Sequence, residues 1–354
     1  MFKNKYILLL TLTLAIIALI FILKSSKTTI KADFAVEDIA SITKIFMSDK
    51  QNNSVTIKRI DEKNWQVNDK YPARVDGMAT ILETISDLHI KEPVSRAGRN
   101  TIIKWLAEKS TKVEIYQTVY RINLFNKIKL FPHEKLTKVY YVGDETQNNM
   151  GTFMLLEGSE EPFVVYVPSF RGYLSPRYTA LESDWRKHIL FELKIGDIKS
   201  VKIEYPATPE SSFEISRFNK DFEIKSLLSN KIINGFDTMK VVEYMSSFSS
   251  VGFESFLNDM KKSDKDSIAS HKPMAILTVT DITGKSTSLK AFLKLAEFGS
   301  VDEITNQPIT IDRDRFYGLI NDDKDFILLQ YYVLNSILQP SSYFKINVSK
   351  NTKE

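Results

Sequence analysis

Apolar and polar residues alternate in two well-separated stretches of the chain, residues 54–59 and 212–217. Alternation with a period of two is typical of a strand with one buried face. Each stretch follows a similar five-residue segment, DIASI from Asp38 and DIKSV from Asp197, and precedes a third short run, WQV in the first copy and FEI in the second. This recurrence at a nearly constant offset predicts two copies of one structural unit.

The three strands of each copy are followed by a segment whose apolar residues recur with helical spacing. Asp76 and Asp237 precede these segments, where we expect them to cap the helices or to lie in their first turns. A second, shorter helix is expected around Trp105 in the first copy and Phe256 in the second. The polar residues 258–273 are expected to form an exposed insertion that only the second copy has. The apolar positions of the longer helices are Met78, Ile81, Leu82, Ile85 and Leu88 in the first copy, and Met239, Val242, Met245 and Phe248 in the second.

Strand-like runs then resume in both copies, and in the second copy the last of them is expected at residues 326–333. Because these runs are spaced as in hairpins, they favour an antiparallel sheet over alternating βαβ units. The expected fold class is therefore α+β, with an N-terminal transmembrane helix followed by two tandem repeats of an antiparallel sheet with helices. We expect an N-terminal membrane anchor with its flanks, a first α+β repeat, an aromatic and basic linker, a second α+β repeat and a C-terminal tail, at residues 1–31, 32–170, 171–195, 196–340 and 341–354.

An uncharged apolar segment precedes the repeats. It reads YILLLTLTLAIIALIFIL, begins at Tyr6, ends at Leu23 and has lysines on both sides. As a helix it would span about 27 Å, close to the roughly 30 Å hydrocarbon core of a bilayer. A cleaved signal peptide would have a shorter apolar region followed by small residues, and a buried core helix would have to accommodate lysines at both ends. The segment predicts an uncleaved single-pass anchor that contacts the lipid bilayer through residues 6–23.

The orientation of this anchor is less strongly specified, because the lysines on its two sides count nearly equally in the positive-inside rule. The tail before Tyr6 is too short to form a domain. We expect the N-terminus to lie in the cytoplasm and the C-terminal body on the other side of the membrane.

The net charge of +4 is concentrated at the N-terminus. Residues 1–31 contain five lysines and no acidic residue, so the rest of the chain carries a net charge of −1. A nearly neutral body has no general electrostatic attraction for nucleic acid, and we expect no nucleic-acid partner. Cysteine is absent, which excludes disulfides, thiolate metal ligands and cysteine nucleophiles.

The histidines offer no metal-binding pattern. His89, His133, His188 and His271 lie far apart in the sequence, and the pair His133-Glu134 lacks the second histidine of a zinc-protease motif. Residues 144–149 (DETQNN) loosely resemble a cation-binding loop, but they lack its ligand spacing and its glycine, so a hairpin turn is favoured. No nucleotide-binding or nucleophile-elbow motif occurs. We therefore expect no catalytic residue, no cofactor and no metal, although a triad can also assemble only in space.

Aromatic and arginine side chains are concentrated between the two copies. Such side chains dominate binding hot spots, and they also pack at seams between structural units, where arginine stacks on tryptophan or tyrosine. We interpret them as a candidate interaction surface or, preferably, as a seam between the repeats. The candidates are Tyr173, Arg177, Tyr178, Trp185 and Arg186.

Four segments resemble an uncharacterised bacterial family catalogued as domain of unknown function 4340. They are WQVNDKYPAR from Trp65, GTFMLLEG from Gly151, GYLSPRY from Gly172 and DWR from Asp184. The resemblance runs through most of the body, although the second copy lacks an equivalent of the YPAR sequence. It implies an envelope protein of Gram-negative bacteria, often with an N-terminal membrane segment, and it implies no known activity. We therefore expect a single-pass protein of the bacterial inner membrane with a periplasmic C-terminal body.

Three functions are compatible with these features. The anchor, the duplication and the lack of catalytic motifs favour a non-catalytic binding or assembly module with an envelope protein as its partner. Related sequences are sometimes grouped with auxiliary components of transport or gliding systems, so an accessory subunit of an ABC-type transport or gliding-related system is an alternative. A hydrolase is the third possibility, and it would require a histidine beside a carboxylate and a nucleophile.

Overall fold

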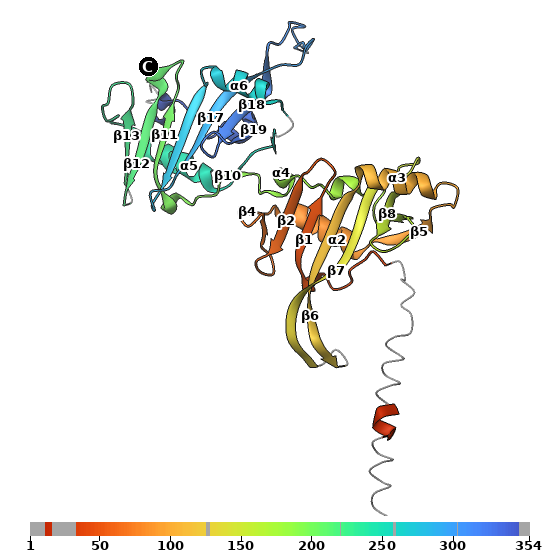
Figure 1. Cartoon of the computed structure of the whole chain (residues 1–354). Coiled ribbons are helices and arrows are strands. Elements are labelled where there is room, and N and C mark those ends of the chain that lie inside the picture. The colour runs from red at the N-terminus through yellow and green to blue at the C-terminus, as the bar shows by residue number, and fades with distance from the viewer. Residues whose placement is uncertain are drawn as a thin grey trace, which may run out of the picture. The chain divides into compact units, whose positions relative to one another are not determined.

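The protein, seen here as a computed structural model, divides into two compact units, Met1–Arg186 and Lys187–Glu354 (Figure 1). Residues 11–15 are helical, and the rest of the predicted anchor lies outside the described residues. Within the described part of the chain, no helix is long and apolar enough to cross a bilayer. The structure describes residues 11–15, 33–124, 128–219, 221–257, 260–302 and 304–346.

The first unit is built on a nine-stranded sheet with the order β4-β3-β2-β1-β6-β7-β8-β9-β5, in which every pairing is antiparallel. Most neighbouring strands are also consecutive in sequence, as the hairpin-like spacing predicted. The strands are β1 (Ile42–Ser48), β2 (Ser54–Arg59), β3 (Trp65–Val67), β4 (Tyr71–Pro72), β5 (His89–Pro93), β6 (Thr111–Leu124), β7 (Ile128–Glu145), β8 (Thr152–Leu156) and β9 (Phe163–Tyr166). The helices are α2 (Val75–Ser86), α3 (Arg99–Lys109) and α4 (Glu182–Trp185).

Cross-strand alignment of apolar residues creates the buried face of this sheet. Ile45 of β1 lies opposite Ile57 of β2 on one side and Ile115 of β6 on the other, and all three side chains are fully buried. Helix α2 covers this face with three of the residues that its periodicity predicted, Met78, Ile81 and Ile85. The alternation of the sequence thus sets the strand register, because a slip of one residue would turn the apolar set to solvent.

The second unit is built on an eight-stranded sheet with the order β13-β12-β11-β16-β17-β18-β19-β15, again antiparallel throughout. Its buried face packs against α5 through Val241, Tyr244 and Met245. The sheet strands are β11 (Ile198–Glu204), β12 (Phe213–Phe218), β13 (Asp221–Ser226), β15 (Ser255–Phe256), β16 (Ala275–Asp281), β17 (Ser286–Leu295), β18 (Ile311–Ile320) and β19 (Asp325–Gln330). The helices are α5 (Thr238–Ser246), α6 (Lys262–Ser270) and α7 (Tyr331–Leu334), and a small second sheet pairs β10 (Ile189–Phe191) with β14 (Val251–Gly252).

The two large sheets have the same strand order, apart from the extra edge strand β4 in the first. One arginine is used in the same way in both. Arg59, at the end of β2, donates from Nε to the carbonyl oxygen of Ile42 (2.7 Å) and from Nη2 to that of Ile39. Arg217, near the end of β12, donates from Nε to the carbonyl oxygen of Ile198 (2.9 Å) and from Nη2 to that of Gly196. In each unit the arginine therefore holds the start of the first strand to the second.

Three details of the expected helices are wrong. Residues 258–273 were expected to be an insertion without a counterpart, but they contain α6, which occupies the same place in strand order as α3 of the first unit. Phe256, expected in that helix, lies instead in β15. In α5 the buried residues are Val241, Tyr244 and Met245, whereas Met239 is exposed. Asp237 caps α5 as expected, since its carboxylate accepts hydrogen bonds from two backbone N–H groups of the first turn.

The segments expected to connect or end the repeats are packed into the units. Residues 171–186 of the expected linker belong to the first unit, and residues 187–195 belong to the second. Phe344, in the expected C-terminal tail, is fully buried in the core of the second unit. The strand expected at 326–333 ends at Gln330 and is followed by α7. These segments are packed in because their apolar residues cover the sheets: Tyr178 and Trp185 in the first unit, and Leu334 and Phe344 in the second.

Candidate functional site

The five side chains singled out between the copies lie at or near the end of the first unit. Tyr178 and Trp185 are buried in its core together with α2 and the sheet. Arg186 is also buried, and its guanidinium stacks 3.7 Å above the ring of Tyr71. Arg177 stacks 3.9 Å above Phe170. Tyr178 and Trp185 thus belong to the core of the first unit, the two arginines stack on aromatic rings of the same unit, and Tyr173 is half-buried. A seam between the repeats stays a prediction.

Local hydrogen bonds fix this segment on α2 and on the strand edge. Arg177 Nη1 donates to Thr84 Oγ1 at 2.7 Å, and Trp185 Nε1 donates to the carbonyl oxygen of Thr179 at 2.9 Å. The backbone N–H of Arg74 donates to the carbonyl oxygen of Trp185 at 2.9 Å, which ties the YPAR sequence to the DWR sequence. Each polar group is thus satisfied within the unit, as burial requires.

Two tyrosine hydroxyls meet at the centre of this packing. Tyr178 and Tyr140 of β7 are fully buried, their rings meet edge to face, and their hydroxyl oxygens lie 3.3 Å apart. Burial raises the pKa of both phenols, because the low-dielectric interior disfavours the phenolate. Both side chains therefore act as neutral core residues, and we assign them no catalytic part.

A hollow of about 350 Å³ lies where α2 begins, and it is lined by Arg177 and Trp185 among others. Beside it, Arg74 Nε donates to Asp76 Oδ1 at 3.0 Å, and this ion pair lowers the pKa of Asp76 to about 2. Asp76 lies in the first turn of α2, as expected. Because Arg74 and Asp76 already pair with each other, neither has a free charge for a ligand in this hollow to bind.

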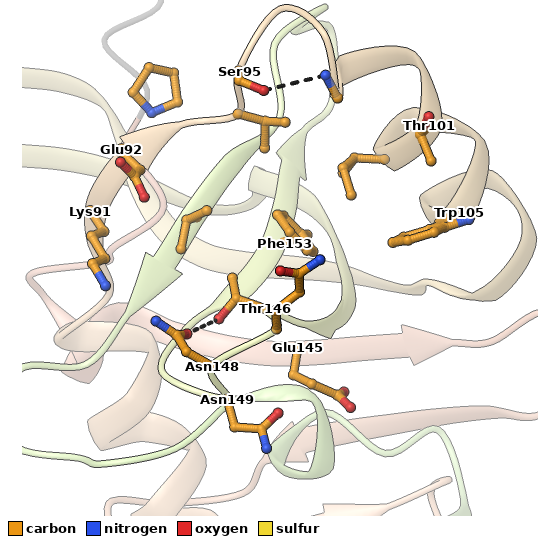
Figure 2. A pocket seen from close by; sticks show the side chains of 16 residues that line it. Lys91, Glu92, Ser95, Thr101, Trp105, Glu145, Thr146, Asn148, Asn149 and Phe153 are labelled. Carbon is orange, nitrogen blue, oxygen red and sulfur yellow. Dashed lines mark hydrogen bonds between the residues drawn. The ribbon is translucent and has the colours of Figure 1, made fainter.

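A second hollow in the first unit, of about 930 Å³, lies between α3, β5 and the turn joining β7 to β8 (Figure 2). Its floor is apolar and includes Ile102 of α3, Phe153 of β8 and Val164 of β9. Trp105 of α3 stands at the edge with 46% of its surface exposed. The hollow is therefore an open apolar surface bounded by a large aromatic side chain.

Polar groups from two directions form the rim of this hollow. Strand β5 supplies Lys91 and Glu92, and the turn supplies Glu145, Gln147 and Asn149. Figure 2 shows Lys91 and Glu92 on one side of Phe153 and Glu145 and Asn149 on another, with the helix residues Thr101 and Trp105 on a third. A concave apolar surface with a few convergent polar groups is the usual form of a ligand site in proteins.

The walls of the hollow are held by specific contacts. The turn closes through a hydrogen bond from the Thr146 N–H to the carbonyl oxygen of Gly151 at 3.0 Å, and Thr146 Oγ1 donates to Asn148 Oδ1 at 2.8 Å. Helix α3 packs so closely on β7 that a Cβ on Gly143 would approach Leu106 Cδ2 to 2.4 Å. Both walls are therefore positioned before any ligand arrives.

The histidines occupy separate surroundings. Nδ1 of His89 lies 3.0 Å from the carbonyl oxygen of Asp87, and Nδ1 of His271 lies 2.7 Å from that of Ser267. His188 stacks on Phe253, and His133 lies exposed in β7. In the described part of the chain, no three histidine, aspartate or glutamate side chains are grouped so that they could hold a metal ion.

The hollow was not found from the sequence. Residues 144–149 were interpreted as a turn, which the structure confirms, and Trp105 was interpreted only as a helix residue. The signal available was weak, because a tryptophan, a turn and an edge strand distant in sequence come together only in the folded sheet. Of the residues predicted to form an interaction surface or a seam, Tyr178, Trp185 and Arg186 are buried in the first unit.

Substitutions in the segment after Phe170 test that packing. We expect Tyr178→Ala to lower the free energy of unfolding by about 3–5 kcal/mol, because it removes a fully buried aromatic side chain. Tyr173→Ala, a half-buried neighbour, should cost about 1 kcal/mol or less. Urea unfolding followed by circular dichroism measures both variants. Equal effects would show that this segment is not part of the core.

Comparison with known proteins agrees with the sequence resemblance. The family model for the domain of unknown function DUF4340 matches residues 65–273, which run from β3 to the end of α6 and beyond. No curated protein and no solved structure matches the chain. Because the matched residues are more than half of the chain, this protein belongs to the DUF4340 family.

Proposed function

We propose that this protein is a membrane-anchored, non-catalytic binding or assembly module of the bacterial envelope, and that the hollow beside Trp105 is its binding site. One observation carries the proposal: a half-exposed indole at the edge of an open apolar floor with a polar rim. Tryptophan supplies a large contact area with few rotatable bonds, and it is enriched at binding hot spots. An assembly partner would bury this surface.

The rim indicates the chemistry of the partner. It carries one cation, Lys91, and two carboxylates, Glu92 and Glu145, among several amide and hydroxyl groups. Such a rim does not favour a strongly anionic ligand, because the carboxylates would repel it. A loop of an envelope protein with an apolar residue and neutral polar neighbours fits both the floor and the rim.

We further propose that the two units are tandem repeats of one ancestral fold. Their common strand order and the matching roles of Arg59 and Arg217 support this proposal. The binding hollow would then be a specialisation of the first repeat.

The anchor proposal rests on the sequence, namely the uncharged segment from Tyr6 to Leu23 between lysines. We propose that it crosses the inner membrane once and leaves both units in the periplasm. A C-terminal fusion to alkaline phosphatase, which is active only after export, should then be active in intact cells, whereas a fusion to a fluorescent protein that matures only in the cytoplasm should stay dark. The reverse pair of results would place the units in the cytoplasm.

Photo-crosslinking tests the binding site. With a photoreactive amino acid at Gln147, an exposed residue of the hollow, we expect capture of a discrete envelope protein. Trp105→Ala should lower the yield at least about tenfold, because loss of a hot-spot side chain weakens binding by 2 kcal/mol or more. Yields are compared by mass spectrometry of cross-linked membranes.

A photoreactive residue at Leu228, exposed on the second unit, is the matched control. It should not capture the same protein. Capture from both positions, or a yield that Trp105→Ala leaves unchanged, would contradict the assignment of the hollow. Failure to capture any protein from Gln147 under several growth conditions would contradict the assembly role itself.

A further inference from the structure

Strands β6 and β7 continue beyond the sheet as a two-stranded arm, which we define as residues 118–124 and 128–136. β1 pairs with β6 only as far as Gln117, and β8 pairs with β7 only from Tyr140 onward. The two strands nevertheless pair with each other out to Leu124 and Ile128. Figure 1 shows this arm projecting from the body of the first unit.

The arm exposes large apolar side chains. Ile122, Ile128 and Leu130 are all exposed, and Phe131 has 63% of its surface exposed. Ile122 lies directly opposite Leu130, so these two side chains are neighbours on one face of the ribbon. A two-stranded ribbon is only marginally stable in water, and a contiguous exposed apolar surface usually marks an interaction site. We therefore expect another surface to cover the apolar side chains of the arm.

The charge of the arm distinguishes a lipid surface from other coverings. The arm carries the cations Arg121, Lys129 and Lys135, and its one acidic residue, Glu134, lies at its base and pairs with Lys44 of β1 at 2.9 Å. The counterpart for comparison is the β17–β18 connection, residues 296–310, which also exposes apolar side chains, among them Phe298. That connection contains three acidic residues and no cation. Beyond that paired carboxylate the exposed apolar side chains of the arm have only cations beside them, and such a surface suits a bilayer with anionic headgroups.

The chain enters the first unit beside the base of the arm. Lys138 of β7 donates from Nζ to the backbone carbonyl oxygen of Asp33 at 2.6 Å and to its carboxylate at 2.9 Å. From Lys138 back to Ile128, the first residue of β7, the strand spans about 33 Å at 3.3 Å per residue. Residues 24–32, between the proposed anchor and Asp33, can span at most about 30 Å. The arm is thus long enough to reach the membrane from which the chain emerges.

We propose that the β6–β7 arm dips into the surface of an anionic bilayer next to the anchor, with its apolar side chains among the acyl chains and its cations at the headgroups. This proposal rests on the proposed membrane anchor. Arg121 and Lys129 can extend their charged ends to the phosphates while their aliphatic stems stay in the apolar layer. The arm would set a fixed distance and tilt of the first unit above the membrane.

Site-directed spin labelling of the full chain tests this inference cleanly, because the protein has no cysteine. Leu130→Cys carries the nitroxide in the arm, and Phe298→Cys carries it in the acidic connection of the second unit. The chain is reconstituted into vesicles of phosphatidylcholine with or without phosphatidylglycerol. In the anionic vesicles we expect the Leu130→Cys label to be accessible to oxygen and shielded from a water-soluble nickel chelate, and the Phe298→Cys label to stay accessible to nickel.

Charge variants give the expected magnitude. Arg121→Gln and Lys129→Gln should each lower the ratio of immersed to free arm about fivefold. This is the change expected when one basic residue near an anionic surface loses its charge. Both lie on exposed positions, so thermal unfolding should be unchanged. In vesicles without phosphatidylglycerol the wild-type arm should lose most of its immersion.

The outcomes separate the arm from the anchor. Resistance of the chain to alkaline extraction reports the anchor, and the label at position 130 reports the arm. A label that stays accessible to nickel while the chain resists extraction would overturn the arm proposal and leave the anchor standing. A label shielded from both oxygen and nickel would also overturn it, and would assign the arm to a protein partner or a second copy. Loss of both readouts would overturn both proposals.

Discussion

An antiparallel sheet has two faces, and each apolar stretch on either face must be covered by another part of the chain. In the first unit one face carries the fully buried residues of β1, β2 and β6, and a single long helix, α2, is too narrow to cover it alone. The remainder is covered by Phe34 before the first strand and by Leu174, Tyr178 and Trp185 after the last. Segments at the two ends of the unit therefore complete the core that the central strands and α2 form.

The need to cover both faces explains which apolar surfaces of the first unit stay exposed. On the second face of the first sheet, α3 packs on β7 and β8 through Ile102 and Leu106. Beside that helix the cover is incomplete, which creates the hollow between β5 and the β7–β8 turn (Figure 2). At another edge of this unit, β6 and β7 extend beyond the strands that pair with them and form the exposed arm. The hollow and the arm are thus both places where a strand or helix has no covering partner in the described residues.

Local pattern predicted much of the fold because each element carries its own periodicity. The alternation of β2 and the helical spacing of α2 were sufficient to place both, and the carboxylate of Asp237 correctly indicated the start of α5. The pattern failed where burial is decided by distant partners. Helix α6 has no fully buried residue and packs through the partly buried Ile268, so its sequence indicated a polar insertion. Tyr178 and its neighbours were predicted to form an interaction surface or a seam between the repeats, whereas Tyr178 is buried in the core of the first unit. The hollow could not be predicted, since its three walls are far apart in sequence.

Residues 174–186 are an integral cover of the first sheet rather than a linker. Hydrogen exchange of the full chain, resolved by mass spectrometry, measures this directly. We expect the backbone N–H groups of Leu174, Tyr178 and Arg74, which donate hydrogen bonds within the unit, to exchange as slowly as those of β1. Exchange of residues 174–186 at the rate of an unstructured peptide, with β1 still protected, would contradict it.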